Sequence, residues 1–383
     1  MDAIVERTPA RGATKLALRE PNAVDFWRGF ALLTIFINHV PGNAFERFTY
    51  SHFSVSDAAE LFVFLAGWAI ALAVRGQRGL EPPSRVVLRL TSRTIEVYRA
   101  QIVITAIALA MIAATALALN NPLVLEWHNA GPVFADPVPT TIGWVLLTHQ
   151  LGYFNILPLY VALLALSPVF VLLARVSRWI ALGLSLALYA VCLTFGINLP
   201  TWPLEGSWFF NPLAWQLLLV LGFLSAELAH GSELYRAWMQ RLMPLGMLGV
   251  AIGIVVAVWD LKPDPLAVPE PRLFFVLDKS NLSPGRLVHF LTVALAFQRV
   301  FPVIARLTPW LAQSCSALGR NSLAVFSMGS IASLGAQLVR FAAPHSFVLD
   351  FALISAGILL LVFTAWFVEW RSRPLSSSQP GSA

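Results

Sequence analysis

The chain has 383 residues, of which 57% are hydrophobic and 12% are charged, with a net charge of +6. A typical soluble domain is about 45–50% apolar and about 25% charged, so this composition leaves too little polar surface for a soluble protein. The apolar residues come in runs of about 20, the length that spans a bilayer as a helix. A soluble α/β protein, the main alternative, would give apolar runs of about 4–8 residues.

The positive charge follows a pattern typical of membrane proteins. Lys and Arg favour one set of loops over the other by about three to one, and such a bias marks the cytoplasmic side. We therefore expect both termini in the cytoplasm, an even number of crossings and, in a bacterium, location in the inner (plasma) membrane. The bias also accounts for the charge without nucleic acid as a partner.

The apolar runs predict an all-α, polytopic membrane helix bundle with about ten transmembrane helices. The short apolar segment 140–154 predicts an interfacial or re-entrant helix on the outer side. We expect a cytoplasmic lead at 1–23, one integral-membrane domain at 24–373 and a disordered tail at 374–383. The ten helices are expected at 24–41, 57–75, 94–119, 155–174, 179–196, 212–229, 242–260, 285–304, 317–340 and 347–370.

The first predicted helix carries three ionisable residues, Asp25, Arg28 and His39. At about 100° per residue they fall within about 60° of one another, and Arg28 and His39 lie about 16 Å apart along the axis. Each such group costs about 2.5–3.5 kcal/mol in hydrocarbon, which favours a functional role inside the bundle. The structural alternative is an Asp25–Arg28 ion pair with His39 at the membrane interface.

The second predicted helix begins with two carboxylates, Asp57 and Glu60, at its outer end. Asp57 is best interpreted as an N-cap. Glu60 is one turn further, close in depth to His39, and a carboxylate there could orient the imidazole and raise its basicity. We therefore predict His39, Glu60 and Asp25 as catalytic residues.

The entry to the third helix has two arginines one turn apart, Arg89 and Arg93. They could hold an anionic ligand at the cytoplasmic surface, and ordinary positive-inside anchoring explains them equally well. On the outer side, two segments combine cations, amides and aromatic rings, a mixture that suits a sugar ligand or the membrane interface. Their candidate acceptor-binding residues are Trp208, Asn211, Trp215, Gln216, Lys279, Asn281, Arg286 and His289.

The cysteines and histidines do not predict a metal centre. Cys192 and Cys315 lie in or beside apolar runs, with no CxxC spacing, and are expected to be small packing residues. The seven histidines are scattered along the chain, so no metal and no permanently bound cofactor are expected.

Several motifs resemble a known family. DFWRGFALLTIFINH followed by SDAAELFVFLAGW is similar to the start of the polytopic acyltransferase 3 superfamily, as are RTIEVY and the Gly–x–x–Ser element of LGRNSLAVFSMG. More narrowly, INHVPGN, SDAAELFVFLAG, WFFNPLAWQ and LDKSNLSPGRLVHFL resemble the OpgC family, over about residues 20–370. In one departure, Gly329 stands where the superfamily often has a second histidine.

This resemblance implies transfer of a succinyl group to osmoregulated periplasmic glucans. It implies that cytoplasmic acyl-CoA, with succinyl-CoA as the favoured form, is the co-substrate and that the glucan is the acceptor, with membrane lipid around the chain. Arg28, Arg89, Arg93 and Tyr98 would bind the donor, and His39 would act as general base. Direct transfer and a covalent acyl-histidine intermediate both fit the sequence.

Three other functions remain open from the sequence. Acetyl or another acyl group could be transferred to a different exported glycan by the same site. A transporter could use Asp25, Arg28 and His39 as an ion relay, although no inverted repeat is visible. A non-catalytic subunit could organise a glucan-export complex.

Overall fold

The computed structural model describes residues 20–76, 79–344 and 346–373. Most of the predicted N-terminal lead and all of the predicted disordered tail lie outside these residues. The described chain is helical apart from irregular loops and one short hairpin, in which β1 (Arg75–Gly76) pairs antiparallel with β2 (Gly79–Leu80). The all-α prediction is therefore confirmed.

Each of the ten predicted ranges overlaps helical residues, but 285–304 and 317–340 each extend over two separate helices. The α-helices are α1 (Ala23–Asn38), α2 (Ala58–Val74), α3 (Pro83–Ala118), α4 (Gly131–Ala135), α5 (Pro137–Val145), α6 (Ile156–Val176), α7 (Arg178–Phe195), α8 (Pro212–Gly231), α9 (Glu233–Arg241), α10 (Met243–Val258), α11 (Pro284–Phe297), α12 (Val300–Leu307), α13 (Pro309–Arg320), α14 (Ser322–Ala342) and α15 (Phe347–Arg371). Four short 3₁₀ helices complete the elements: η1 (Glu46–Phe48), η2 (Tyr50–Phe53), η3 (Pro122–Asn129) and η4 (Arg272–Phe274).

The helices make this a multi-pass membrane protein. Six described helices, namely α3, α6, α7, α8, α14 and α15, are long and apolar enough to cross a membrane. The number rises to eight if the pairs α9–α10, bent by 45°, and α11–α12, bent by 48°, each form one span. The short helices α1 and α2, with 16 and 17 residues, would be needed to reach ten crossings, and that count stays a prediction.

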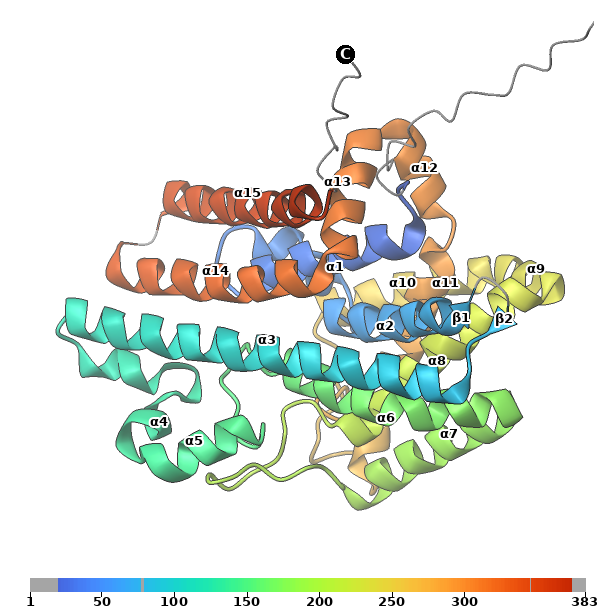
Figure 1. Ribbon diagram of the computed structural model, residues 1–383, viewed down its shortest axis with the longest axis horizontal. Helices are drawn as coiled ribbons and strands as arrows, with labels where there is room; N and C mark the ends of the chain where they lie inside the picture. Colours follow the sequence, from blue (N-terminus) through green and yellow to red (C-terminus); the bar gives the residue numbers. More distant parts are fainter. Residues whose placement is uncertain (1–19, 77–78, 345, 374–383) are drawn as a thin grey trace, which may run out of the picture.

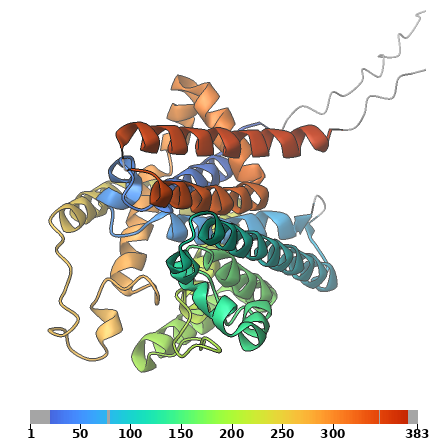
Figure 2. The ribbon, with the colours of Figure 1, turned by 90° about the vertical axis from the view of Figure 1, so that its left-hand side faces the viewer.

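The bundle is layered. Helices α15, α14 and α3 lie side by side in that order, whereas α13 stands at a steep angle to them (Figures 1 and 2). Helix α1 packs between α13, α14 and α2. It begins on the side of the bundle where α15 ends (Figure 1), as an even number of crossings requires.

Glycines allow α1 and α13 to touch backbone to backbone. A Cβ added at Gly29 would lie 1.9 Å from the carbonyl oxygen of Cys315, and one at Gly319 would lie 1.8 Å from that of Asp25. Small residues at such crossings let membrane helices approach closely. Cys315, whose buried thiol is free, therefore takes part in this packing contact through its backbone, in keeping with the packing role that the sequence predicts.

Replacing Gly319 with alanine should destabilise this crossing. The added methyl group must push α13 away from α1, and overpacking of this kind costs about 1–3 kcal/mol. Gly183 in α7 is the matched control because a Cβ there meets nothing within 4 Å. Gly183→Ala should leave stability unchanged or raise it slightly. Thermal unfolding of the purified variants in detergent would contradict the prediction if both variants melted at the same temperature.

The segment 140–154 is less helical than predicted. Helix α5 covers its first residues and ends at Val145, and the remainder up to α6 is irregular. Leu147 and Tyr153 have left-handed backbone, with φ of 62° and 64°, a conformation that a regular helix cannot include. The loop folds back instead, and Tyr153 is brought to the end of α1.

Candidate active site at the two ends of the first helix

The N-terminal part of α1 holds a partly buried polar group around Arg28. The Arg28 guanidinium donates a hydrogen bond to the hydroxyl of Ser322, at the start of α14. Asp25, one turn earlier, is buried and accepts a 2.5 Å hydrogen bond from the amide of Asn22. Gly319 and Ser322, the two residues of the Gly–x–x–Ser element, thus serve one site: the glycine admits α1 and the serine binds its arginine.

The other predicted donor-binding residues divide between two places. Arg93 is close enough to Arg28 for an electrostatic interaction, and it also pairs with Glu96 at 2.6 Å. Arg89 instead forms a 2.8 Å ion pair with Glu81, after the β1–β2 hairpin. Tyr98 donates a 2.9 Å hydrogen bond to the carbonyl of Val145, at the end of α5.

The C-terminal end of α1 presents His39 to three residues from distant parts of the chain. His39 is the C-cap of the helix, and its ring contacts the edge of Tyr153 with the ring centroids 5.0 Å apart. Tyr153 also contacts His128 at 5.3 Å. Gln337 of α14 donates a 2.5 Å hydrogen bond to the His39 carbonyl and interacts with the His128 side chain.

Both aromatic neighbours of this histidine have strained backbone. His128 and Tyr153 have φ of 55° and 64°, values that residues other than glycine rarely adopt and that cluster at functional sites. The His128 Nε2 atom is buried and has no hydrogen-bond partner among the described residues. Burial lowers the pKa of His128 below its ordinary value and so favours its neutral imidazole.

One face of α14 joins the two ends of α1. Ser322 binds Arg28 and Gln337 binds His39, and the two are separated by about 22 Å of helical rise. Ser330 and Ser333 lie between them and are also buried, although their hydroxyls already donate to backbone carbonyls of α14. A polar stripe on α14 therefore runs from the Arg28 end to the His39 end.

The loop after His39 is fixed by a buried ion pair. Arg340 donates hydrogen bonds of 2.5 and 2.9 Å to the carbonyls of Pro41 and Gly42. Its partner Asp350, 2.9 Å away, accepts a 2.9 Å hydrogen bond from the backbone amide of Ala44. Helices α14 and α15 thus hold the chain on the far side of His39 as well.

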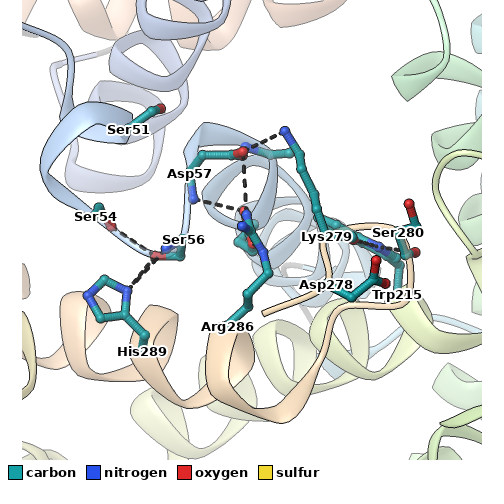
Figure 3. Close-up of polar contacts among 12 residues, drawn as sticks. Ser51, Ser54, Ser56, Asp57, Trp215, Asp278, Lys279, Ser280, Arg286 and His289 are labelled. Carbon is teal, nitrogen blue, oxygen red and sulfur yellow. Dashed lines mark hydrogen bonds and ion pairs between the residues drawn. The ribbon is translucent and has the colours of Figure 1, made fainter. Parts of the chain in front are cut away.

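A four-residue charge cluster lies at the start of α2 (Figure 3). Asp57 pairs with Lys279 at 2.5 Å and with Arg286 at 3.4 Å, and Arg286 pairs with Glu60 at 2.6 Å. Two cations thus balance two carboxylates, of which Glu60 is fully buried. Burial alone would raise the pKa of Asp57, but Lys279 and Arg286 beside it hold that pKa well below its usual range.

This cluster also forms the start of α2. Asp57 is the N-cap, as the sequence predicts, and accepts a 2.8 Å hydrogen bond from the Ala59 amide. Glu60 completes a capping box by accepting from the Asp57 amide at 3.0 Å. The predicted contact of Glu60 with His39 is not among those of the described residues. Its two oxygens bind Arg286 and the Asp57 amide.

His39 is nevertheless within electrostatic range of the cluster, through Lys279 and Asp57. Lys279 is the most open of the four residues, with 36% of its side chain exposed. The structure therefore brings the Lys279–Asp57 ion pair within electrostatic range of the predicted base, where the sequence suggested a contact with Glu60.

A second histidine lies behind the cluster (Figure 3). His289 Nδ1 accepts a 3.2 Å hydrogen bond from the Ser56 amide and lies 3.0 Å from the Ser56 hydroxyl. That hydroxyl lies 2.6 Å from the hydroxyl of Tyr50, whose pKa is raised by burial. All of these groups are partly or fully buried, so the predicted acceptor residue His289 helps to position the segment before α2.

The remaining predicted acceptor residues mostly support the 278–283 segment from inside. Trp215 donates to the carbonyls of Lys279 and Ser280, and Asn211 binds Asn281 at 3.0 Å. Gln216 exchanges hydrogen bonds with Ser185, and Trp208 is also buried. Of the eight residues, Lys279 and Asn281 are the two that are partly exposed, because the others are needed to build the core beneath them.

No local pattern in the sequence predicts a role for Tyr153, His128, Gln337 or Ser56. Their neighbours lie far away in the chain, so no local spacing could reveal them, although His128 is a histidine within a predicted outer loop. No group of three or more His, Cys, Asp or Glu is placed to bind a metal ion within residues 20–76, 79–344 and 346–373.

Comparisons with known proteins give one clear result. The family model described as OpgC protein matches residues 19–373, nearly the whole chain. No curated protein and no solved structure matches the chain. A match of this extent identifies the family, and the chain belongs to the OpgC family.

Proposed function

We propose that this protein is a membrane O-acyltransferase that moves an acyl group, succinyl in the first instance, from cytoplasmic acyl-CoA to hydroxyls of a periplasmic glucan. Membership of the OpgC family, which implies a glucan-modifying acyltransferase, supports the reaction class. The observation that carries the proposal is the arrangement of α1, with a half-buried arginine at one end and a histidine at the other. The stripe on α14 alongside provides a polar route between them.

In this proposal, Arg28 and Arg93 attract the anionic donor from the cytoplasmic side. The extended arm of the donor follows the polar stripe of α14 past Ser330 and Ser333. The thioester then reaches His39, while Tyr153 and Gln337 limit the movement of that residue. The orientation of the bundle, with α1 beginning in the cytoplasm, belongs to the proposal and rests on the arginine bias of the loops.

The chemical step is a direct transfer. An imidazole nitrogen of His39 removes the proton from a glucan hydroxyl, and the oxygen attacks the thioester carbonyl. The carbon–sulfur bond breaks, and the departing coenzyme A sulfur takes up the proton from the imidazolium. An acyl group released from the donor before glucan is added would instead indicate an acyl-histidine intermediate.

Lys279 is the residue that we propose for recognition of the acyl group. Its ammonium is partly exposed and within electrostatic range of His39, so it can bind the free carboxylate of a succinyl group. The ammonium would bind Asp57 and the succinyl carboxylate at the same time. A donor without a second carboxylate, such as acetyl-CoA, would lack this contact.

The test is transfer of label from succinyl-CoA to neutral periplasmic glucan by the purified protein in proteoliposomes. Mass spectrometry of the glucan separates the two main acyl groups, because succinylation adds a carboxylate and acetylation does not. Failure of the wild-type protein to transfer label from any acyl-CoA would contradict the proposed function. Transfer of acetyl alone would contradict the role of Lys279.

We expect His128 to position His39. His128→Asn should lower kcat/KM for acyl transfer by about 10–100-fold, since small displacements of a catalytic group have effects of this size. Asparagine tolerates the left-handed backbone of this position, so the variant should fold normally. In the wild type, protonation of His128 in acid places a positive charge beside His39 and lowers activity, so the acid side of the pH profile should become shallower in the variant.

His128→Val tests separately whether the backbone at this position is constrained. It also removes the imidazole, but it places a β-branched residue in left-handed backbone. It should be less stable than His128→Asn in thermal unfolding, although both lack the ring. Equal stability would indicate that the backbone at residue 128 is not constrained. An unchanged pH profile in His128→Asn would remove the positioning role.

A further inference from the structure

A polar cavity lies at the end of α2 opposite to the Asp57 cluster. It has a volume of about 780 Å³ and is lined by residues from the ends of α2, α6 and α8 and from the start of α7. Its charged residues are Arg75, Arg175, Arg178 and Glu227. Three arginines face one glutamate, so the cavity has an excess of positive charge.

The four charges are not equivalent. Arg75 is held by Glu227 at 2.9 Å, and these two charges offset each other. Arg178, in the first turn of α7, is exposed. The first backbone amides of α7 accompany it, since Ser177 is the N-cap of this helix and also lines the cavity. Helix N-termini favour anionic ligands.

Arg175 has unpaired donors, which indicate a ligand independently of the N-terminus of α7. One of its terminal nitrogens donates a 2.6 Å hydrogen bond to the Glu81 carbonyl. Its Nε and its other terminal nitrogen are buried and have no hydrogen-bond partner within the described residues. A guanidinium that only stabilised the end of α6 would use these donors on carbonyl oxygens. Buried charged donors of this kind require an acceptor.

We infer that this cavity binds a phosphate group, held by Arg175, Arg178 and the first amides of α7. Paired guanidinium donors and a helix N-terminus both suit phosphate oxygens. Glu81 connects the cavity to the predicted donor-binding residue Arg89, since its carboxylate binds Arg89 and its carbonyl binds Arg175. The phosphate belongs either to coenzyme A, an assignment that rests on the proposed function, or to the head group of an anionic phospholipid.

The experiment uses the full chain in nanodiscs of phosphatidylcholine. Calorimetric titration measures the affinity for coenzyme A and for pantetheine, its phosphate-free counterpart. Native mass spectrometry, after reconstitution with added phosphatidylglycerol, measures how much of this lipid stays bound. The variants are Arg175→Gln and Arg178→Gln, and the control is Arg306→Gln, at the last turn of α12 and outside the cavity lining. Thermal unfolding verifies that each variant is folded.

Removal of one charge-assisted hydrogen bond should weaken phosphate binding about tenfold. If coenzyme A is the source, its affinity falls in both cavity variants while that of pantetheine does not change. If lipid is the source, bound phosphatidylglycerol is lost and the affinity for coenzyme A is unchanged. The inference is overturned if both cavity variants bind both ligands as Arg306→Gln does. Lipid bound here by a protein that transfers no acyl group would support the site and contradict the proposed function.

Discussion

Replacement of His39 by alanine is expected to lower acyl transfer by about 10²–10⁴-fold, the contribution typical of a general base. The side chain contacts Tyr153 at the surface of the bundle core, and its backbone carbonyl accepts from Gln337. The carbonyl contact survives the substitution, so the variant should fold and should still bind the donor. Initial rates in proteoliposomes, at saturating succinyl-CoA and glucan, measure the loss.

The control for this variant is His52→Ala. His52 lies in η2, on the same side of the bundle, and is exposed, so its loss should leave the rate unchanged. Undiminished transfer by His39→Ala would remove the catalytic assignment without affecting the fold or the family. A rate that falls equally in both variants would indicate a general effect of outer histidines.

Arg286→Met should be the most destabilising single substitution in the charge cluster. It leaves the fully buried Glu60 without its main cation, and breaking a buried ion pair from one side costs about 3–5 kcal/mol. The double variant Arg286→Met with Glu60→Met should recover much of this loss, because Asp57 and Lys279 still neutralise each other. Thermal unfolding of the single and double variants measures the difference.

A surface ion pair provides the comparison. Arg272 and Glu270 form a 2.8 Å pair in which both side chains are largely exposed, and Arg272→Gln should cost less than about 1 kcal/mol. If Arg286→Met were no more destabilising than Arg272→Gln, the cluster would not be a structural unit. If the double variant were the less stable of the two Arg286 variants, the capping bond of Glu60 to the Asp57 amide would stabilise the protein by more than its unpaired charge destabilises it.

Features with a local cause were predictable from the sequence. The approximate positions of the long apolar helices and the N-cap at Asp57 follow from hydropathy and from the short range of capping interactions. The role of Glu60 in a capping box was also available from the Asp–x–x–Glu spacing. The depth of Glu60 in the predicted helix instead suggested a contact with His39, but in the structure one carboxylate oxygen binds Arg286 and the other binds the Asp57 amide.

Features that depend on packing between distant segments could not be predicted. The group around His39 combines residues from α1, from η3, from α14 and from the loop that precedes α6. Taken alone, each segment has the polar residues expected of any segment at a membrane interface. The burial of most predicted acceptor-binding residues also depends on packing between distant segments. Trp215 and Gln216 look suitable for a sugar in sequence, but the fold uses their polar atoms to hold the 278–283 segment and α7.

The single uninterrupted helix beside α1 has a consequence for donor selection. Because α14 fixes Ser322 and Gln337 about 22 Å apart, the two ends of the proposed site cannot approach each other independently. A donor held at the arginine end must therefore have its thioester carbon at a fixed distance from its anionic end. The site would select donors by the length of the arm between these two points before it selects them by acyl group. Acyl carriers with a shortened arm should bind and yet not react.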